Sequence, residues 1–257
     1  MLITLIGAGR VANHLGPALF KAGHRFEQVY SRTMAHASEL ADTLGAEAVD
    51  QPAAIKPGAD LYLCALSDDA LTTVLDEMPL NQWDNPLLVH TAGSLPLSLL
   101  APYTNRAGVL YPLQTFSPNR PLDLTSLPLF VEATDDTTLQ MISALATDIS
   151  GVVKPLASEK RLTLHLAAVY ACNFVNHLYG VAGELLEEDG LDFSLLLPLI
   201  DETAAKVHDL APREAQTGPA VRNDRRVIDK HLLLLANHPE KAALYKLLSE
   251  HIHQHFL

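Results

Sequence analysis

The sequence is poor in cysteine, and this scarcity excludes two ways of stabilising or equipping a protein. Only Cys64 and Cys172 occur among its 257 residues, the first in a strand-like run and the second in a helix-like run. No C-x-x-C spacing is present, so the pattern supports neither a disulfide framework nor a cysteine-ligated metal site. We expect both thiols to be inert core groups, and we expect no metal.

Basic residues and long apolar runs are also scarce. Lysine and arginine total 18 against 30 aspartates and glutamates, which gives a formal net charge of −12. Such a field repels nucleic acids and anionic membranes, so we expect neither as a partner. No apolar run is long enough to cross a bilayer, and the first strand-like run begins at residue 2, which leaves no room for a signal peptide. These features predict a cytoplasmic protein.

A glycine-rich turn near the N-terminus is the first feature that points to a ligand. After a strand-like run at residues 2–6, the sequence Gly7-Ala8-Gly9-Arg10-Val11-Ala12 matches the pattern G-x-G-x-x-A and opens a helix. The first glycine permits a tight turn, the second lets a pyrophosphate approach the backbone, and the alanine lets the helix pack on the strand. The helix N-terminus favours the phosphates through its N–H groups and dipole. We predict a dinucleotide site here; the alternative is a plain strand-to-helix turn.

The end of the second predicted strand indicates which dinucleotide is bound. Residues 26–30 form this strand, and Ser31-Arg32-Thr33 follow where an NAD-binding unit places an acidic residue for the ribose hydroxyls. Arg32 can pair with a 2′-phosphate and stack on adenine, while Ser31 can donate a hydrogen bond. We therefore predict NADP(H) as the cofactor, held by all three residues. The alternative is a solvated loop arginine.

The order of the predicted elements defines the fold class. Strand-like runs at 61–66, 87–91, 108–113, 129–133 and 152–155 alternate with helical runs, whereas the periodicity from residue 158 onward is helical. A hydrophobic content of 48% indicates a globular chain. We predict an α/β protein with a Rossmann-type, doubly wound, mainly parallel sheet in residues 1–156. An all-α domain follows in residues 157–257, and we expect it to bind substrate and form a dimer.

Ligands bind at the carboxyl ends of the strands in an open α/β sheet, so the loops there are candidate site segments. We expect Leu66 and Ser67 to line the cofactor, and Asp68 and Asp69 to cap the helix from Ala70 to Glu77. The next two strands run into His-Thr-Ala-Gly-Ser at 90–94 and Tyr-Pro-Leu-Gln-Thr-Phe-Ser at 111–117. From these loops we assign Tyr111 and Gln114 to catalysis and Ser94 and Thr115 to substrate binding.

The first helix of the second part carries polar side chains on an apolar background. Taken as one helix at about 100° per residue, residues 159–187 place Arg161, His165, Ala168, Cys172, Asn176 and Tyr179 in one sector, flanked by Asn173 and His177. Buried polar groups need partners, which are each other, a neighbouring helix or a substrate. We predict a site with His165, Asn173 and Asn176 as catalytic groups and His177 as a substrate-binding group. Structural hydrogen bonding is the alternative.

Several motifs together resemble a known family. The N-terminal half is similar to the dinucleotide domains of the 6-phosphogluconate dehydrogenase-like superfamily, which includes hydroxyacid dehydrogenases, pyrroline-5-carboxylate reductase and ketopantoate reductase. HTAGS, YPLQTFS, KRLTLHLAAVYACNFVNH and AQTGPAVRND together resemble Rossmann-like proteins that carry domain of unknown function 2520, which are described as NADP oxidoreductases. The resemblance covers nearly the whole chain. It implies a helical second domain, dimerisation through that domain and a nucleotide-dependent reduction.

One departure from the superfamily bears on the mechanism. Its hydroxyacid dehydrogenases use Lys-x-x-x-Asn on the first long helix of the second domain, whereas here Lys160 is followed four residues later by Leu164. The lysine mechanism therefore does not transfer. His165 is the substitute that we expect, because a group titrating near neutrality can give a proton to a carbonyl or imine as hydride arrives.

Two functional hypotheses follow. The first is an NADPH-dependent oxidoreductase that acts on a small polar carbonyl or imine substrate; the second is a nucleotide-binding sensor or interaction protein that has lost turnover. A deazaflavin coenzyme is a further alternative to NADP(H). The histidines at 251, 253 and 255 resemble a solvated helix end more than a metal site.

A Gly-Pro turn in the C-terminal part precedes an arginine in this acidic chain. In Thr-Gly-Pro-Ala-Val-Arg-Asn-Asp, residues 217–224, Asp224 can cap the next helix and Arg222 can hold a carboxylate or phosphate bidentately. We predict a substrate-binding corner at Arg222 that reaches across a homodimer. A helix-start turn with a solvated arginine is the alternative.

Overall fold

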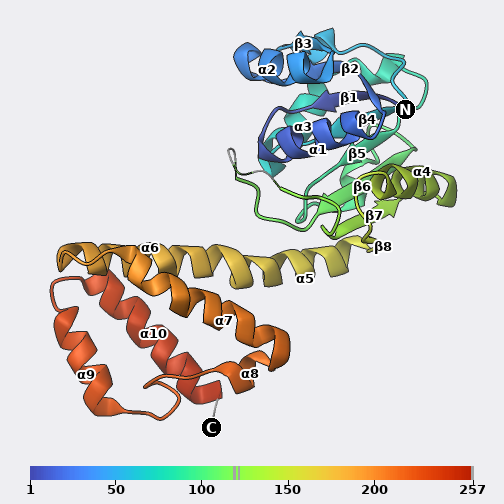
Figure 1. Cartoon of the computed structure of the whole chain (residues 1–257). Coiled ribbons are helices and arrows are strands. Elements are labelled where there is room, and N and C mark those ends of the chain that lie inside the picture. The colour runs from blue at the N-terminus through green and yellow to red at the C-terminus, as the bar shows by residue number, and fades with distance from the viewer. Residues whose placement is uncertain (118–119, 121, 256–257) are drawn as a thin grey trace. The chain divides into compact units, whose positions relative to one another are not determined.

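The computed structural model describes residues 1–117, 120 and 122–255 and divides the chain into two compact units (Figure 1). The sheet unit comprises Met1–Cys172 and the helical unit Asn173–Leu257. Helix α5 (Ser158–Ala168) is thus grouped with the sheet, although its sequence periodicity resembles that of the helices that follow.

The sheet unit is built on eight strands in the order β3-β2-β1-β4-β5-β6-β7-β8. All neighbouring pairs are parallel except β6 and β7, which are antiparallel. This confirms the predicted α/β class with a mainly parallel sheet. The strands are β1 (Leu2–Ile6), β2 (Arg25–Tyr30), β3 (Glu47–Val49), β4 (Leu61–Cys64), β5 (Leu88–His90), β6 (Ala107–Pro112), β7 (Leu129–Ala133) and β8 (Val153–Pro155).

Helices cover both faces of this sheet, which is why its central strands are mostly apolar. One buried cluster joins side chains of β1 to those of α1 (Arg10–Lys21), α2 (Met34–Leu44) and α4 (Asp136–Thr147). A second cluster joins Ile6 and Tyr62 to α3 (Asp68–Glu77) on the other face. The arrangement leaves the carboxyl ends of β1, β2, β4 and β5 at one edge, where the predicted ligand loops begin.

The helical unit contains α6 (Val175–Glu188), α7 (Leu197–Asp209), α8 (Pro212–Ala215), α9 (Arg225–Leu234) and α10 (Pro239–His255). Gly190 at φ +68° lies between α6 and α7, and Gly218 at φ +110° lies between α8 and α9; the left-handed region that both occupy favours glycine. Among the described residues, no helix combines the length and apolar character that spanning a bilayer requires.

The long predicted helix at 159–187 has an irregular centre. Residues Val169–Phe174 form a π-helix between α5 and α6. A π-helix, whose hydrogen bonds join residues i and i+5, turns by a smaller angle per residue than an α-helix does. The assumption of about 100° per residue therefore fails beyond residue 168. The prediction of one continuous polar sector is therefore wrong. The expectation of a core position for Cys172 is also wrong, because its side chain is exposed, whereas Cys64 is buried as predicted.

Candidate functional site

The turn after β1 contains two glycines, and the lack of a side chain has a different physical reason at each. Gly7 has φ +114° and donates its N–H to the carbonyl of Tyr30 at 2.8 Å, and a Cβ there would lie 2.3 Å from the carbonyl oxygen of Ala65. A Cβ on Gly9 would meet no described atom within 4 Å. The fold itself therefore requires glycine at position 7, whereas at position 9 the absence of a side chain leaves open space beside the helix N-terminus.

Asn13 holds this turn in place, and its role was not predicted. Its side-chain amide donates to the carbonyls of Ala8 at 2.9 Å and Gly9 at 3.0 Å. Helix α1 begins at Arg10, and the N-cap residue Gly9 has no side chain to accept from the first N–H groups. Ala12 is fully buried in the core, as the motif requires. The turn thus presents a supported helix N-terminus of the kind that binds phosphate.

The loop after β2 lies beside this turn because Tyr30 accepts the Gly7 N–H. Ser31 donates its backbone N–H to Val49 at 3.1 Å, and Thr33 precedes the first residue of α2. Arg32 is exposed, and no carboxylate of the described residues lies within ion-pair distance of it. An exposed guanidinium without a carboxylate partner can bind an added phosphate.

The loop after β4 borders the same turn. The strand ends at Cys64, two residues earlier than predicted, and the side chain of Leu66 comes within 3.2 Å of the position a Gly7 Cβ would occupy. Ser67 is the N-cap of α3, so the prediction that Asp68 and Asp69 cap a helix starting at Ala70 is wrong. The hydroxyl of Ser94 reaches the Asp68 carboxylate instead, which fixes the two loops to each other.

Two predicted catalytic side chains meet in the sheet unit. The hydroxyl of Tyr111, at the end of β6, lies 3.1 Å from Nδ1 of His165 on α5, and the two rings are in an edge-to-face arrangement with centroids 6.0 Å apart. Burial raises the pKa of Tyr111, and the Arg161 guanidinium opposes this. The phenol therefore stays protonated at neutral pH. A tyrosine and a histidine separated by 54 residues thus form one hydrogen-bonded pair.

Helix α5 is anchored one turn before His165 by a buried arginine. Arg161 is 1% exposed and donates to the Glu132 carboxylate, to the Leu95 carbonyl at 2.6 Å and to the Ser158 hydroxyl at 3.1 Å. Glu132 on β7 also accepts from Ser158 N–H at 3.0 Å and from its hydroxyl at 2.8 Å. The sequence pattern placed Arg161 in the polar sector of the helix but indicated no function for it. Its contacts set the position of His165 against the sheet.

His90 begins the His-Thr-Ala-Gly-Ser loop but lies in the interior. Its side chain is fully buried, and Nδ1 accepts the Ala92 N–H at 3.2 Å. Burial, followed by the charge of Arg161, lowers the pKa of His90 to about 4. His90 is therefore neutral at physiological pH and supports the loop rather than exchanging protons.

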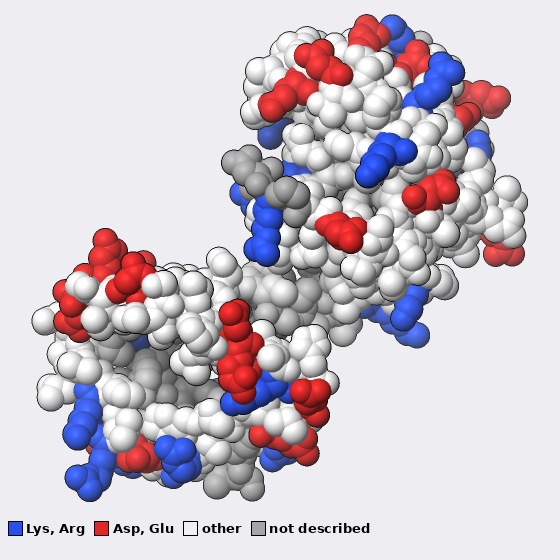
Figure 2. Space-filling view, in the orientation of Figure 1, with Lys and Arg blue, Asp and Glu red and all other residues white. Residues whose placement is uncertain are grey.

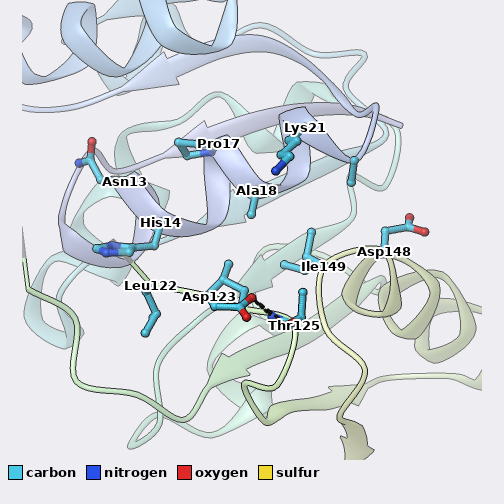
Figure 3. A pocket seen from close by; sticks show the side chains of 12 residues that line it. Asn13, His14, Pro17, Ala18, Lys21, Leu122, Asp123, Thr125, Asp148 and Ile149 are labelled. Carbon is cyan, nitrogen blue, oxygen red and sulfur yellow. Dashed lines mark hydrogen bonds between the residues drawn. The ribbon is translucent and has the colours of Figure 1, made fainter. Parts of the chain in front are cut away.

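Two pockets adjoin α1. One of about 670 Å³, drawn in Figure 3, runs along α1 from Asn13 to Lys21 and faces Asp123, whose carboxylate accepts from the Thr125 N–H and hydroxyl at 2.9 and 2.8 Å. No predicted site residue lines it. The other, of about 290 Å³, is lined by Gln114, Thr115, His14, Ser117, Arg120 and Leu122. Two predicted site residues thus line the smaller pocket.

The remaining predicted residues lie in the helical unit. Asn173, Asn176 and His177 are exposed, and so is Arg222 in the turn before α9. The expectation of a buried polar cluster on this helix is therefore wrong for the single chain. The Asp224 carboxylate accepts the Val227 N–H at 3.3 Å, which confirms the predicted cap. Within the described residues, no group of three histidine, cysteine or carboxylate side chains forms a metal site.

Comparison with known proteins identifies the family. A Rossmann-like domain model matches residues 1–116, and the model for domain of unknown function 2520 matches residues 127–252. A solved structure from Bacteroides fragilis, described as a "putative NADP oxidoreductase", is 44% identical, with a TM-score of 0.91 and 98% of each chain covered. The chain belongs to the Rossmann-like proteins with a DUF2520 domain. No curated protein matches it significantly.

More distant structures share the fold of this DUF2520 protein. An imine reductase from Streptomyces aurantiacus is 17% identical with a TM-score of 0.69, and 99% of this chain and 94% of that chain are covered. An imine reductase from Myxococcus stipitatus, solved with NADP⁺, is 17% identical with a TM-score of 0.65, and the alignment covers 99% and 92% of the chains. The family models and the 44% identical structure confirm the predicted family membership, whereas these two more distant structures show only a shared fold.

Proposed function

We propose that this DUF2520 protein is an NADP(H)-dependent oxidoreductase that reduces a small polar carbonyl or imine compound. The observation that carries the proposal is the Tyr111–His165 pair, which lies in the same unit as a dinucleotide turn with an open side at Gly9. The similar structures described as an NADP oxidoreductase and as imine reductases support it. Bound NADPH would supply the hydride.

The residues around the nucleotide turn fit this cofactor. The uncapped N-terminus of α1 and the space at Gly9 suit a pyrophosphate, with Ala8, Arg10 and Val11 completing the turn. Ser31, Arg32 and Thr33 would hold the 2′-phosphate, and Leu66 and Ser67 would line the cofactor. A charge-assisted hydrogen bond contributes about 1.5–3 kcal/mol, so we expect roughly ten- to a hundredfold preference for NADPH over NADH.

The Tyr111–His165 pair supplies the proton. In the protonated imidazole, Nδ1 donates to the Tyr111 hydroxyl oxygen, and Nε2 holds the proton that passes to the substrate oxygen or nitrogen. The tyrosine fixes the ring, and the Arg161 anchor fixes the helix that carries it. Gln114, Thr115 and Ser94 orient the substrate. Substrate contact by Asn173, Asn176, His177 and Arg222 stays a prediction, for which Arg222→Met should weaken substrate binding while NADPH binding is retained.

The cofactor assignment is tested by titrating the full chain with NADPH and NADH. Arg32→Glu should remove the preference for NADPH, because it places a carboxylate where the phosphate binds. Arg25→Glu is the matched control, since Arg25 is also exposed but stands at the opposite end of β2. Equal affinities of the unaltered protein for both nucleotides would contradict the assignment.

The reaction is tested by NADPH oxidation with cyclic imines, aldehydes and ketones. His165→Gln should lower turnover by about 10² to 10⁴ and leave NADPH affinity unchanged, because a positioned general acid contributes that much. His208→Gln, an exposed histidine on α7, should leave turnover unchanged. A panel without any turnover, combined with tight NADPH binding, would favour a nucleotide sensor over an enzyme.

The helical unit pairs with a second copy of this chain. Large apolar side chains that are exposed in the single chain include Leu195, Leu199, Leu233, Leu234 and Leu247. Exposed large apolar side chains in such number favour an interaction surface, and a second copy carries the same side chains. Light scattering of the full chain at micromolar concentration should give the mass of a dimer. A monomer would contradict the pairing.

A further inference from the structure

Gly93 lies where the two rings of the Tyr111–His165 pair meet. A Cβ on Gly93 would stand 2.7 Å from Nδ1 of His165 and 2.8 Å from both Cε2 and Cζ of Tyr111. These distances are shorter than carbon–carbon or carbon–nitrogen contacts allow. Gly93 is not among the residues with positive φ, so the space taken by the two rings, and not the backbone conformation, requires glycine.

The loop that carries Gly93 cannot retreat without losing hydrogen bonds. Four hydrogen bonds hold it. Thr91 N–H donates to Cys64 O at the end of β4 at 3.1 Å, and Ala92 N–H donates to His90 Nδ1 at the start of the loop at 3.2 Å. On the α5 side, the Arg161 guanidinium donates to Leu95 O at 2.6 Å, and Leu97 N–H donates to Ser158 Oγ at 2.9 Å. Two of these contacts come from the helix that also carries His165. A side chain at position 93 would therefore displace the rings before it displaced the loop.

We propose that Gly93 is a positioning residue whose missing side chain lets Tyr111 and His165 form their hydrogen bond. The proposal rests on the proposed function for the catalytic meaning of that bond, but the bond itself is measurable without a substrate. Any larger residue at 93 should separate the hydroxyl of Tyr111 from Nδ1 of His165, while the nucleotide turn around Gly7 stays intact.

Nitrogen NMR of the ¹⁵N-histidine-labelled full chain measures the bond directly, with the His165 signals assigned through His165→Gln. Gly93→Ala should move the His165 Nδ1 signal as far as Tyr111→Phe does, and the double variant should move it no further, because both changes remove one interaction. Gly151→Ala is the matched control, since its Cβ would lie at an ordinary 3.4 Å from the Thr125 carbonyl oxygen. It should leave the signal in place.

Each outcome separates the two claims. An unshifted His165 signal in folded Gly93→Ala would overturn the positioning role. A shifted signal with full turnover of 2-methyl-1-pyrroline by NADPH, if the unaltered protein reduces it, would contradict the catalytic role of the pair and leave the positioning role standing. Should Gly93→Ala fail to fold, adding Tyr111→Leu and His165→Ala should restore folding by removing the clashing atoms. Continued failure would overturn the proposal.

Discussion

The two units of the chain differ in how far they bury their apolar side chains. In the sheet unit, leucine, isoleucine and valine residues from β1, β4, β5 and β6 are buried between helices on both faces. In the helical unit, Ala220 and Leu235 are the buried apolar residues among those described, while Leu233 and Leu234 are 77% and 78% exposed. The sheet unit therefore has its own apolar core, whereas the helical unit leaves large apolar side chains exposed in the single chain.

The polar contacts differ in the same direction. The helical unit is tied together by partly exposed pairs, such as Lys241 with Glu184 at 3.0 Å and His231 with Tyr245 at 2.8 Å. Exposed pairs of this kind contribute little to stability. The sheet unit instead buries the Arg161–Glu132 pair and a neutral His90 beside the candidate site. Figure 2 shows acidic and basic side chains interspersed on the drawn face rather than gathered into one basic patch among the described residues.

Arg161→Met should produce the largest loss of stability. Removing one partner of a buried ion pair leaves the other charge uncompensated, which costs about 3–5 kcal/mol of unfolding free energy. Lys206→Met is the matched control in the helical unit, because Lys206 pairs with Glu202 at 3.6 Å on an exposed face and its loss should cost less than about 1 kcal/mol. Urea unfolding monitored by circular dichroism compares the two. Equal losses would remove the distinction between the units.

His90 should make the sheet unit sensitive to acid. Its pKa is about 4 in the folded chain and near 6.5 in the unfolded chain, so between these values the unfolded chain binds more protons. The contribution of neutral His90 to the free energy of unfolding is complete above pH 6.5. It falls by about 3 kcal/mol at most as the pH drops to 4. His90→Asn, whose amide oxygen can accept the Ala92 N–H, should flatten this part of the pH profile. His36→Gln, an exposed control on α2, should not.

The fold could be predicted because its signals are local. Residues 2–12 define the first strand–helix unit, because an apolar run, a glycine turn and a helix start follow one another there. The alternation of strands and helices then repeats along the sheet. The π-helix at Val169–Phe174 could not be predicted, because an apolar pattern alone does not distinguish i→i+5 from i→i+4 hydrogen bonding. The exposure of Cys172 was missed because an apolar pattern does not show whether another part of the chain packs on that face.

The candidate site was predictable by parts. Tyr111 follows from its place at a strand end and His165 from its place on a helix, but their meeting is a tertiary contact. Gly93 and Arg161 support the site through contacts with residues far away in the sequence: Arg161 donates to the carbonyl of Leu95 across 66 residues. Such supporting roles leave no local sequence pattern, because they depend on contacts that form only in the folded chain.

The two glycines of the nucleotide turn should separate stability from binding. Gly7→Ala forces a positive φ on alanine and brings its Cβ against the Ala65 carbonyl, which should cost about 1–3 kcal/mol of unfolding free energy. Gly9→Ala meets open space and should change that free energy by less than about 0.5 kcal/mol. It should nevertheless weaken NADPH binding, because the methyl group occupies the space left for the pyrophosphate. Thermal unfolding and nucleotide titration measure both effects; unchanged NADPH affinity in Gly9→Ala would remove the turn from the binding site.

The double variant Leu233→Glu/Leu234→Glu on α9 should have the smallest effect on the folding of one chain. It is also the sharpest test of the comparison between the units. Both side chains are exposed in the single chain, so the change buries no charge there and should alter the folding of a monomer by less than about 0.5 kcal/mol. In a dimer the same charges would face an apolar partner surface and favour dissociation. The unaltered chain should therefore show a melting temperature that rises with protein concentration, and the variant should not. Leu15→Ala in the sheet core is the contrasting control: it should lower the melting temperature at every concentration and leave the dimer intact, because its cost of about 2–5 kcal/mol comes from a cavity within one chain.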